Sequence, residues 1–195
     1  MFCDIRSEEA VFDAVRATVE KFGAIDLCIN NASAISLTGT LETPMKKYDL
    51  MNQVNARGTY LVSQACLPHL LKSKFTPHIL NLSPPVTSIK EKWFEPNVAY
   101  ALAKFGMSLC ALGMAGEFRG KVAVNTLWPR TTIATAAVNM LGGEDLMKAS
   151  RKPEIMADAA YAILTRGLDF TGNFCIDDEV LRSVGVTDLK AYNVD

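Results

Sequence analysis

A tyrosine and a lysine at helical spacing are the residues of this chain best suited to acid/base chemistry. They occur in the segment Asn97-Val-Ala-Tyr-Ala-Leu-Ala-Lys-Phe-Gly106. The segment is typical of a helix start, because Asn97 is a favoured N-cap residue and alanine is a strong helix former. Tyr100 and Lys104 then share one helix face, although this spacing is also typical of solvated surface pairs. A phenol has a pKa of about 10, and a nearby ammonium lowers it, so such a tyrosine can exchange protons with an alcohol or a carbonyl oxygen.

The elements that must position this pair alternate between short apolar strands and longer helices. Ser7 is a candidate N-cap for a helix that Gly23 ends, with an apolar stripe of Val11, Phe12, Val15 and Val19. A helical stretch is predicted to begin at Pro44, further helices over residues 51–71, 97–119 and 154–164, and strands over residues 1–5, 25–29, 78–82, 122–127 and 172–176. This alternation predicts an α/β fold with a parallel sheet covered by helices on both faces.

Polar and chain-breaking residues recur where the predicted strands end. They are Asp4, residues 30–33, Ser83 and residues 129–132. Each alone is typical of an ordinary strand-to-loop transition. Ligands bind parallel sheets at the carboxyl ends of the strands, so the recurrence favours a binding site at that edge.

Composition restricts the classes of function. The chain has 195 residues and a formal net charge of −1, which argues for one domain and against a large nucleic-acid footprint. The sequence contains no uninterrupted apolar run of the roughly 18 residues that a membrane span needs. Its five cysteines are scattered among apolar runs, a pattern that predicts free thiols in a reducing compartment and no metal site.

Taken together, these motifs resemble the short-chain dehydrogenase/reductase family over nearly the whole chain. The resemblance rests on Tyr100-x-x-x-Lys104 after a strand ending at Ser83, on Asn30-Asn-Ala32, on Asn55 and on Pro129. It implies a Rossmann-like three-layer fold in a single domain over residues 1–195. It also implies an oxidoreductase that uses NAD or NADP to interconvert an alcohol and a carbonyl, with a lipid-like substrate as one alternative.

The resemblance also implies residue roles. Tyr100 would be the general acid/base, and Lys104 would lower its pKa and bind the nicotinamide ribose. Asn55 would hold a water that relays protons to Lys104, and Ser83 is the candidate oxyanion donor. The remaining cofactor contacts would be Asn30 and Ala32 on the adenosine ribose, Asp4 on the adenine edge, and Thr132 and Ile133 near the nicotinamide amide.

The sequence departs from the family pattern at several points. Ser33 and Arg130 replace glycines, and Pro84 stands where the family carries its usual serine. The sequence contains no Gly-x-x-x-Gly-x-Gly, the turn that lets the backbone approach a pyrophosphate. The first βαβ portion of the fold is therefore expected to be missing, with about 50 to 75 further residues needed to complete the domain at its N-terminus.

Several alternatives stay open at this level. The chain is either part of an active oxidoreductase or a catalytically inactive fragment or pseudoenzyme with an interaction or regulatory role. Met107 and Met114 indicate a packing face, with a homo-oligomer interface as one alternative. Trp93 and Phe94 either shape an apolar substrate wall or pin a loop, and the acidic run 177–179 is read as a solvated turn. An intracellular location is expected, with peroxisome, mitochondrion and cytoplasm all open.

Overall fold

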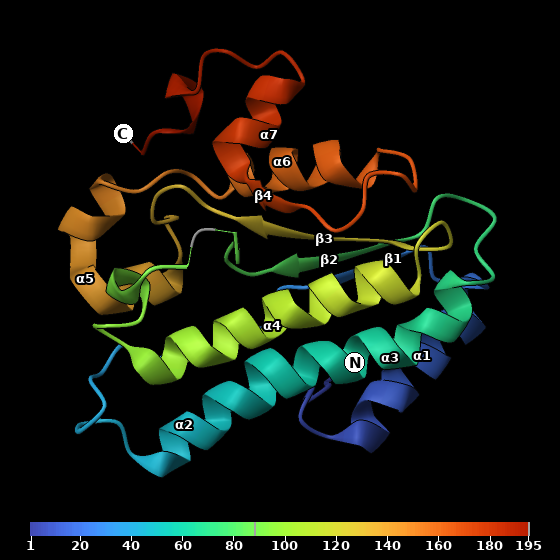
Figure 1. Cartoon of the computed structure of the whole chain (residues 1–195), viewed down its shortest axis with the longest axis horizontal. Coiled ribbons are helices and arrows are strands. Elements are labelled where there is room, and N and C mark those ends of the chain that lie inside the picture. Colours follow the sequence, from blue (N-terminus) through green and yellow to red (C-terminus); the bar gives the residue numbers. More distant parts are fainter. Residues whose placement is uncertain (88, 195) are drawn as a thin grey trace. The chain divides into compact units, whose positions relative to one another are not determined.

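The computed structural model describes residues 1–87 and 89–194 and has an α/β, Rossmann-like fold (Figure 1). Its four strands are ordered β1-β2-β3-β4, and β1 runs parallel to β2, with Leu27 opposite His78 and Asn30 opposite Asn81. The elements in chain order are α1 (Glu8–Phe22), β1 (Leu27–Asn30), α2 (Met45–Met51), a π-helical turn (Asn52–Arg57), α3 (Gly58–Leu70), β2 (His78–Leu82), a 3₁₀ turn (Glu91–Trp93), α4 (Val98–Glu117), β3 (Ala123–Trp128), α5 (Ala136–Lys148), α6 (Glu154–Leu164), β4 (Phe174–Ile176), α7 (Asp177–Ser183) and a 3₁₀ turn (Lys190–Tyr192).

The chain divides into two compact units. The first contains residues 1–126 and 167–174, and the second contains residues 127–166 and 175–195. The single domain expected from the sequence stays a prediction.

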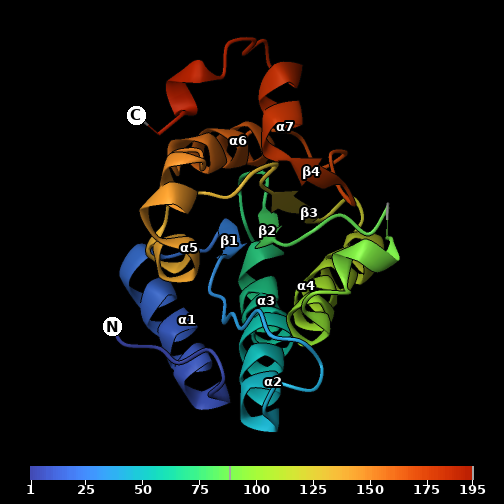
Figure 2. The same ribbon diagram turned by 90° about the vertical axis from the view of Figure 1, so that its left-hand side faces the viewer.

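In the first unit, α1, α3 and α4 lie side by side along one face of the strands (Figure 2). They enclose a core that draws on α1, β1, α3, β2, α4 and β3. Its fully buried members include Val11, Leu70, Ile79, Val122 and Val124. Burial of apolar side chains is the main force that holds helices against a sheet.

Helix α1 follows the sequence pattern closely. The Ser7 hydroxyl accepts a hydrogen bond from the Ala10 N–H at 3.3 Å, and Gly23 ends the helix at φ 84°. Glycine adopts this left-handed conformation without steric cost. Val11 and Val15 are buried as expected, but Phe12 is 43% exposed, so its placement in the apolar stripe was wrong.

The strand expected over residues 1–5 was also wrong, since these residues form no strand. A strand is stable only when its backbone pairs with a neighbour, and no described strand lies beyond β1. The outer edge of β1 is therefore open among the described residues. Leu27 and Ile29 on β1 are 46% and 49% exposed.

The long helix expected over residues 51–71 is interrupted by the π turn. There the Gly58 N–H contacts the carbonyl of Gln53, five residues earlier. Such a turn accommodates one more residue than an α-helical turn and is frequent at functional sites. Pro68 lies inside α3 near its end, as the sequence indicated.

The second unit contains two helices that the sequence analysis did not predict, α5 and α7. The Thr135 hydroxyl accepts from the Val138 N–H at the start of α5, and Gly143 kinks that helix at φ 61°. Helix α6 spans Glu154–Leu164, as predicted. Short bridges join Ile133 to Arg151 and Arg151 to Asn193.

Candidate active site

Helix α4 carries the tyrosine and the lysine near its N-terminal end. Asn97 occupies the N-cap position, as predicted, but its side chain makes no capping hydrogen bond. The half-buried Tyr100 packs against a small cluster of Met51, Ala99 and Ala103. Lys104 is only 5% exposed, which is unusual for a lysine and needs a polar partner.

The buried ammonium of Lys104 is held at the end of β2. Its Nζ donates to the Leu82 carbonyl at 2.7 Å and lies 3.5 Å from the Met107 sulfur. Burial lowers the pKa of Lys104 from 10.5 to about 8, because the charged form loses hydration. Near neutral pH this lysine can therefore both give up and regain a proton.

The pKa of Tyr100 departs from the sequence-based expectation. Burial raises it from 10.0 to about 12, because a phenolate loses more hydration than a neutral phenol. Lys104 is not among the causes of this shift, so the lowering of the Tyr100 pKa by Lys104 stays a prediction. Tyr100 is thus a protonated phenol at neutral pH.

Asn55 connects the π turn to the loop that follows β1. Its side chain is fully buried, with Oδ1 accepting from the Ala34 N–H at 2.8 Å and Nδ2 donating to the Ala34 carbonyl at 2.9 Å. This pair of bonds fixes the loop that follows Asn30 and contains Ala32. The water that Asn55 is expected to hold stays a prediction.

A buried chain of side-chain hydrogen bonds joins this loop to α4. The Asn30 Nδ2 donates to Ser63 Oγ at 2.9 Å and to Asn81 Oδ1 at 2.8 Å, and the Asn81 Nδ2 donates to the Met107 carbonyl at 3.1 Å. Ser63 and Asn81 were missed by the sequence analysis. The signal available was an asparagine in the middle of the apolar strand His78–Leu82.

Ser83 and Pro84 lie directly after β2. The Ser83 hydroxyl is fully buried and has no hydrogen-bond partner among the described residues, whereas Ser108 Oγ donates to the Pro84 carbonyl at 2.6 Å. A buried hydroxyl without a partner is costly and therefore a candidate for a ligand contact. The oxyanion role of Ser83 stays a prediction.

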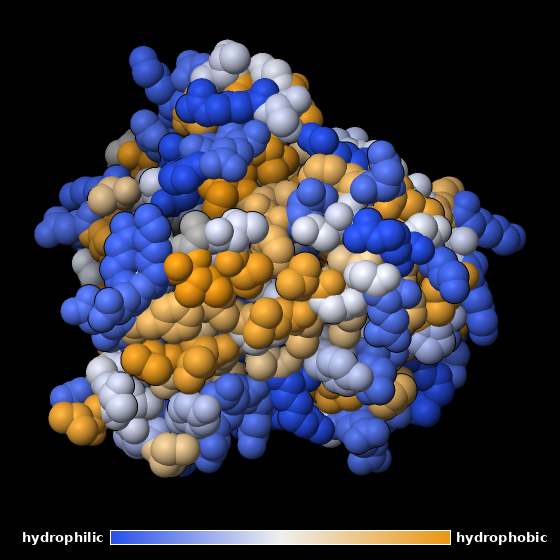
Figure 3. Space-filling view, viewed as in Figure 1, coloured by the Kyte–Doolittle hydropathy of each residue, from blue (hydrophilic) through white to orange (hydrophobic). Residues whose placement is uncertain are grey.

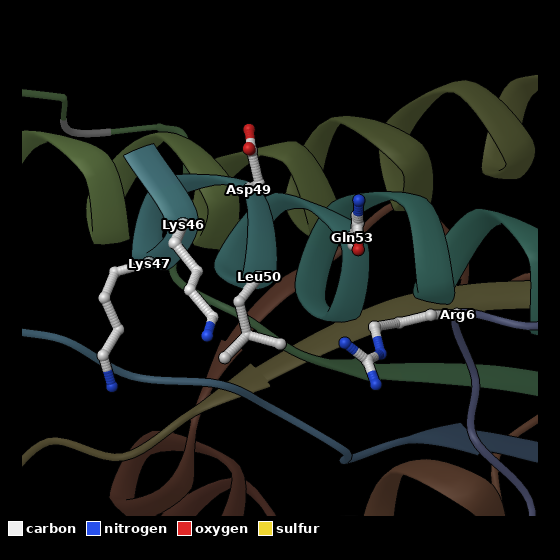
Figure 4. A pocket seen from close by; sticks show the side chains of 6 residues that line it. All are labelled: Arg6, Lys46, Lys47, Asp49, Leu50 and Gln53. Carbon is white, nitrogen blue, oxygen red and sulfur yellow. The ribbon is translucent and has the colours of Figure 1, made fainter. Parts of the chain in front are cut away.

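Asp4 is engaged by a neighbouring arginine. Its carboxylate accepts from Arg6 Nε at 3.0 Å and Arg6 Nη2 at 2.6 Å, and these bonds lower the pKa of Asp4 to about 2. Arg6 also borders an open hollow of about 610 Å³ beside α2, together with Lys46, Lys47, Asp49, Leu50 and Gln53 (Figure 4). In Figure 4 the cationic side chains extend to one side of the helix and Asp49 to the other. The three cations that line this hollow, Arg6, Lys46 and Lys47, suit an anionic group.

In the second unit, Thr132 and Ile133 are fixed by their own neighbours. The Thr132 and Ser150 hydroxyls lie 2.7 Å apart, and the Thr132 carbonyl accepts from the Arg151 N–H at 3.0 Å. Ile133 is bridged to Arg151. Their predicted contacts with the nicotinamide amide stay predictions.

The acidic run 177–179 is not a solvated turn, because it begins α7. Asp177 is fully buried, and its Oδ1 accepts from the Arg130 N–H at 2.9 Å. The Arg130 guanidinium pairs with Asp178 and Glu179. These residues hold the segment after β3 that leads to Thr132.

The segment between Ser83 and α4 contains both an anchor and an exposed aromatic side chain. Phe94 stacks on Phe105 of α4, with ring centroids 4.9 Å apart and an interplanar angle of 17°. Trp93 is 53% exposed. Phe94 therefore pins the segment to the helix, whereas the Lys92 ammonium lies 5.0 Å from the centroid of the Trp93 ring.

Comparison with known proteins agrees with this arrangement. Residues 1–162 match the family described as enoyl-(acyl carrier protein) reductase. The chain is 59% identical to hydroxysteroid dehydrogenase-like protein 2 of Danio rerio over 98% of its own length and 46% of that protein. Its identity to the Homo sapiens protein of that name is 52%, over 98% of this chain and 45% of that one. The chain thus spans about half the length of the curated relatives it matches.

Solved structures give the same assignment. A crystal structure of a short-chain dehydrogenase from Mycobacterium thermoresistibile has a TM-score of 0.90 and 54% identity, covering 98% of this chain and 68% of that one. A protein of Xanthomonas campestris described as a dehydrogenase has a TM-score of 0.93 and 59% identity, covering 99% and 71%. By sequence, fold and the placement of its tyrosine and lysine on α4, this chain belongs to the short-chain dehydrogenase/reductase family.

Proposed function

We propose that the chain carries the proton-transfer part of an oxidoreductase that interconverts an alcohol and a carbonyl with NAD or NADP. The observation that supports this most directly is the burial of Lys104 at the end of β2, one helical turn from Tyr100. Burying an ammonium costs free energy, and a purely structural role does not require a lysine at a buried position. Family membership supports the same reaction class.

The titration of the two side chains suits carbonyl reduction. A bound nicotinamide would supply the hydride. Tyr100, with its pKa of about 12, is protonated at neutral pH and so is ready to donate its phenolic proton to a developing alkoxide. Lys104, with its pKa of about 8, can return a proton toward the phenol oxygen.

The residues of the chain fit such a cofactor in part. The unpartnered Ser83 hydroxyl and the chain from Asn30 to Asn81 provide polar groups near the strand ends. Arg6, Lys46 and Lys47 provide positive charge in the hollow beside α2. The sequence contains no Gly-x-x-x-Gly-x-Gly turn for the pyrophosphate.

A lipid-like alcohol or ketone is the substrate class we favour. The relatives named hydroxysteroid dehydrogenase-like protein 2 point in this direction, and the exposed indole of Trp93 would suit an apolar body. The intracellular location and the choice between NAD and NADP stay predictions.

The first test is a titration of the chain with NADH and NADPH in which nicotinamide fluorescence reports binding. Saturable binding supports the proposal. Tyr100→Phe should bind cofactor as well as the wild type yet lose at least about 100-fold in turnover, because general acid catalysis contributes about that much. Tyr161→Phe, at a 72% exposed position, is the matched control and should keep full turnover.

A catalytically inactive chain with an interaction or regulatory role is the second candidate. It is favoured by Pro84 at the family's serine position and by Arg130 at a family glycine position. In that case no saturable nicotinamide binding is observed, and the proposal of activity for this chain fails.

A further inference from the structure

Two thiols face each other between β1 and α3. Cys28 of β1 and Cys66 of α3 are 4% and 7% exposed and belong to the same core cluster. Both are free, and each thiol is the largest cause of the pKa shift of the other. The reaction proposed above uses neither of them.

The local geometry explains why these thiols meet. Residues i and i+2 of a strand lie on one face, as do residues i and i+3 of a helix. Asn30 and Ser63 are joined by a 2.9 Å hydrogen bond. Cys28 lies two residues before Asn30, and Cys66 lies three residues after Ser63, so the two thiols form the next contact of the same strand–helix interface.

We propose that Cys28 and Cys66 are a redox modification site, at which a hydroperoxide oxidises the two thiols to a disulfide between β1 and α3. The site responds to peroxide in a reducing compartment and is restored by thiol reductants. Transient disulfides of this kind are the usual form in such compartments.

The two thiols differ in reactivity. The hydrogen bond from Cys28 lowers the pKa of Cys66, and the same bond raises the pKa of Cys28. Cys66 is therefore the better peroxide nucleophile, because the thiolate is the reactive form. Its sulfur attacks a peroxide oxygen, the O–O bond breaks, and the sulfenic acid and one water form.

Cys28 completes the reaction. Its sulfur attacks the sulfenic sulfur of Cys66, the S–S bond forms, and the hydroxyl departs as a second water with the Cys28 proton. In total, two thiols are oxidised and one hydrogen peroxide is reduced to two waters. No other reductant or oxidant is required.

Access to the pair depends on β1. Leu27 and Ile29, on either side of Cys28 in this strand, are about half exposed. Local opening of part of a fold requires less free energy than global unfolding. A molecule as small as hydrogen peroxide then reaches Cys66 without loss of the fold.

Oxidation has a consequence for the site proposed above. A disulfide brings the two sulfurs to about 2.05 Å, much closer than hydrogen-bonded thiols. β1 must then shift toward α3, and the bonds from Asn30 to Ser63 and Asn81 shift with it. This part of the inference rests on the proposed function: oxidised chain should bind the nicotinamide cofactor several-fold more weakly.

Peptide mapping tests the disulfide directly. The chain is treated with hydrogen peroxide, its remaining thiols are blocked, and it is digested with trypsin without reductant. Each cysteine of the pair lies in its own tryptic peptide, residues 22–46 and 58–72. We expect these peptides to appear linked, the count of free thiols to fall by two, and dithiothreitol to restore both.

Two variants sharpen the test. Cys66→Ser should give no linked peptide, whereas Cys110→Ser, which removes a half-buried thiol of α4, should leave the link unchanged. Absence of the 22–46/58–72 link in the folded wild-type chain, or an equal yield of links to Cys3 or Cys110, overturns the proposal. Circular dichroism of each variant confirms that the chain being oxidised is folded.

The mapping does not depend on cofactor binding. A peroxide-dependent link without nicotinamide binding in either redox state leaves the redox site standing and contradicts the proposed function. Nicotinamide binding without a peroxide-dependent link overturns the redox site and leaves the proposed function standing. A link that forms without changing nicotinamide affinity overturns the predicted effect on the site.

Discussion

At the scale of single residues, Tyr100 and Lys104 are tuned in opposite directions by the same cause. Both lose hydration inside the first unit, so both favour their neutral forms. The pair is therefore poised as a neutral acid beside a lysine that titrates close to physiological pH. Burial is the cause of both pKa shifts, whereas the sequence predicted a lowering of the Tyr100 pKa by Lys104.

The lowered pKa of Lys104 makes folding stability depend on pH. Its pKa is 10.5 unfolded and about 8 folded, so the unfolded state binds more protons between these values, and stability rises as pH increases through that window. From about pH 7.5 to about pH 9.5 the gain is about 2 kcal/mol. Tyr100, whose pKa is raised from 10.0, destabilises the fold only as the pH rises above 10.

Urea unfolding at several pH values measures this effect. Lys104→Met should lose the rise in stability that the wild type displays, whereas Lys47→Met, at an exposed position, should keep it. Identical pH profiles for the wild type and Lys104→Met would show that the buried ammonium is not the source.

At the scale of elements, much of the fold could be predicted because local signals and tertiary packing agree. Capping by Ser7, the stop at Gly23 and the apolar strand at His78–Leu82 each have a local cause. Helix α6 was predicted to the residue. Helix α7 was missed because its acidic first turn, which suits a helix N-terminus, also reads as a surface turn.

What could not be predicted depends on contacts distant in sequence. The strand expected at residues 1–5 lacks a described partner, and the π turn cannot be distinguished from an α-helix by apolar spacing. The site residues of α4 were identified from their own segment. Asn81 was missed because its partners, Asn30 and Met107, are on other elements.

Two glycines of α4 test how tightly the π turn packs. A Cβ on Gly106 would lie 2.8 Å from the Ala56 Cβ in that turn, whereas a Cβ on the exposed Gly113 would meet nothing within 4 Å. Gly106→Ala should therefore destabilise the chain by about 1–3 kcal/mol. Gly113→Ala should stabilise it by up to about 1 kcal/mol through helix propensity. Chemical denaturation measures both, and a stabilising Gly106→Ala would mean that the two helices have room to separate.

At the scale of the whole molecule, the outer face of α4 is an exposed apolar surface. Leu102, Leu109 and Leu112 are 47%, 59% and 47% exposed, and Figure 3 displays apolar side chains gathered over this helix. Met107 and Met114 are buried in the core, as expected of a packing face. By length and mean hydropathy alone α4 would be long enough to cross a membrane, but half of that stretch is buried inside the structure.

An exposed leucine face of this kind predicts self-association of the chain. Leu109→Glu should weaken a homodimer by about tenfold or more, since burying one leucine contributes about 1.5–3 kcal/mol. Leu41→Glu, at a 96% exposed loop position, is the control. Sedimentation velocity over a concentration series measures both, and a wild-type chain that stays monomeric at every concentration contradicts the prediction.

The extra residue in the π turn between Asn52 and Arg57 changes the rotation of α2 about the helix axis relative to α3. Each residue added to an α-helix turns the chain after it by about 100°. Loss of a single codon there would give a smoother helix, but would rotate Met51 and Tyr48 away from the side that α3 presents. We expect natural variants of the protein to retain the number of residues in this segment as well as the buried Asn55.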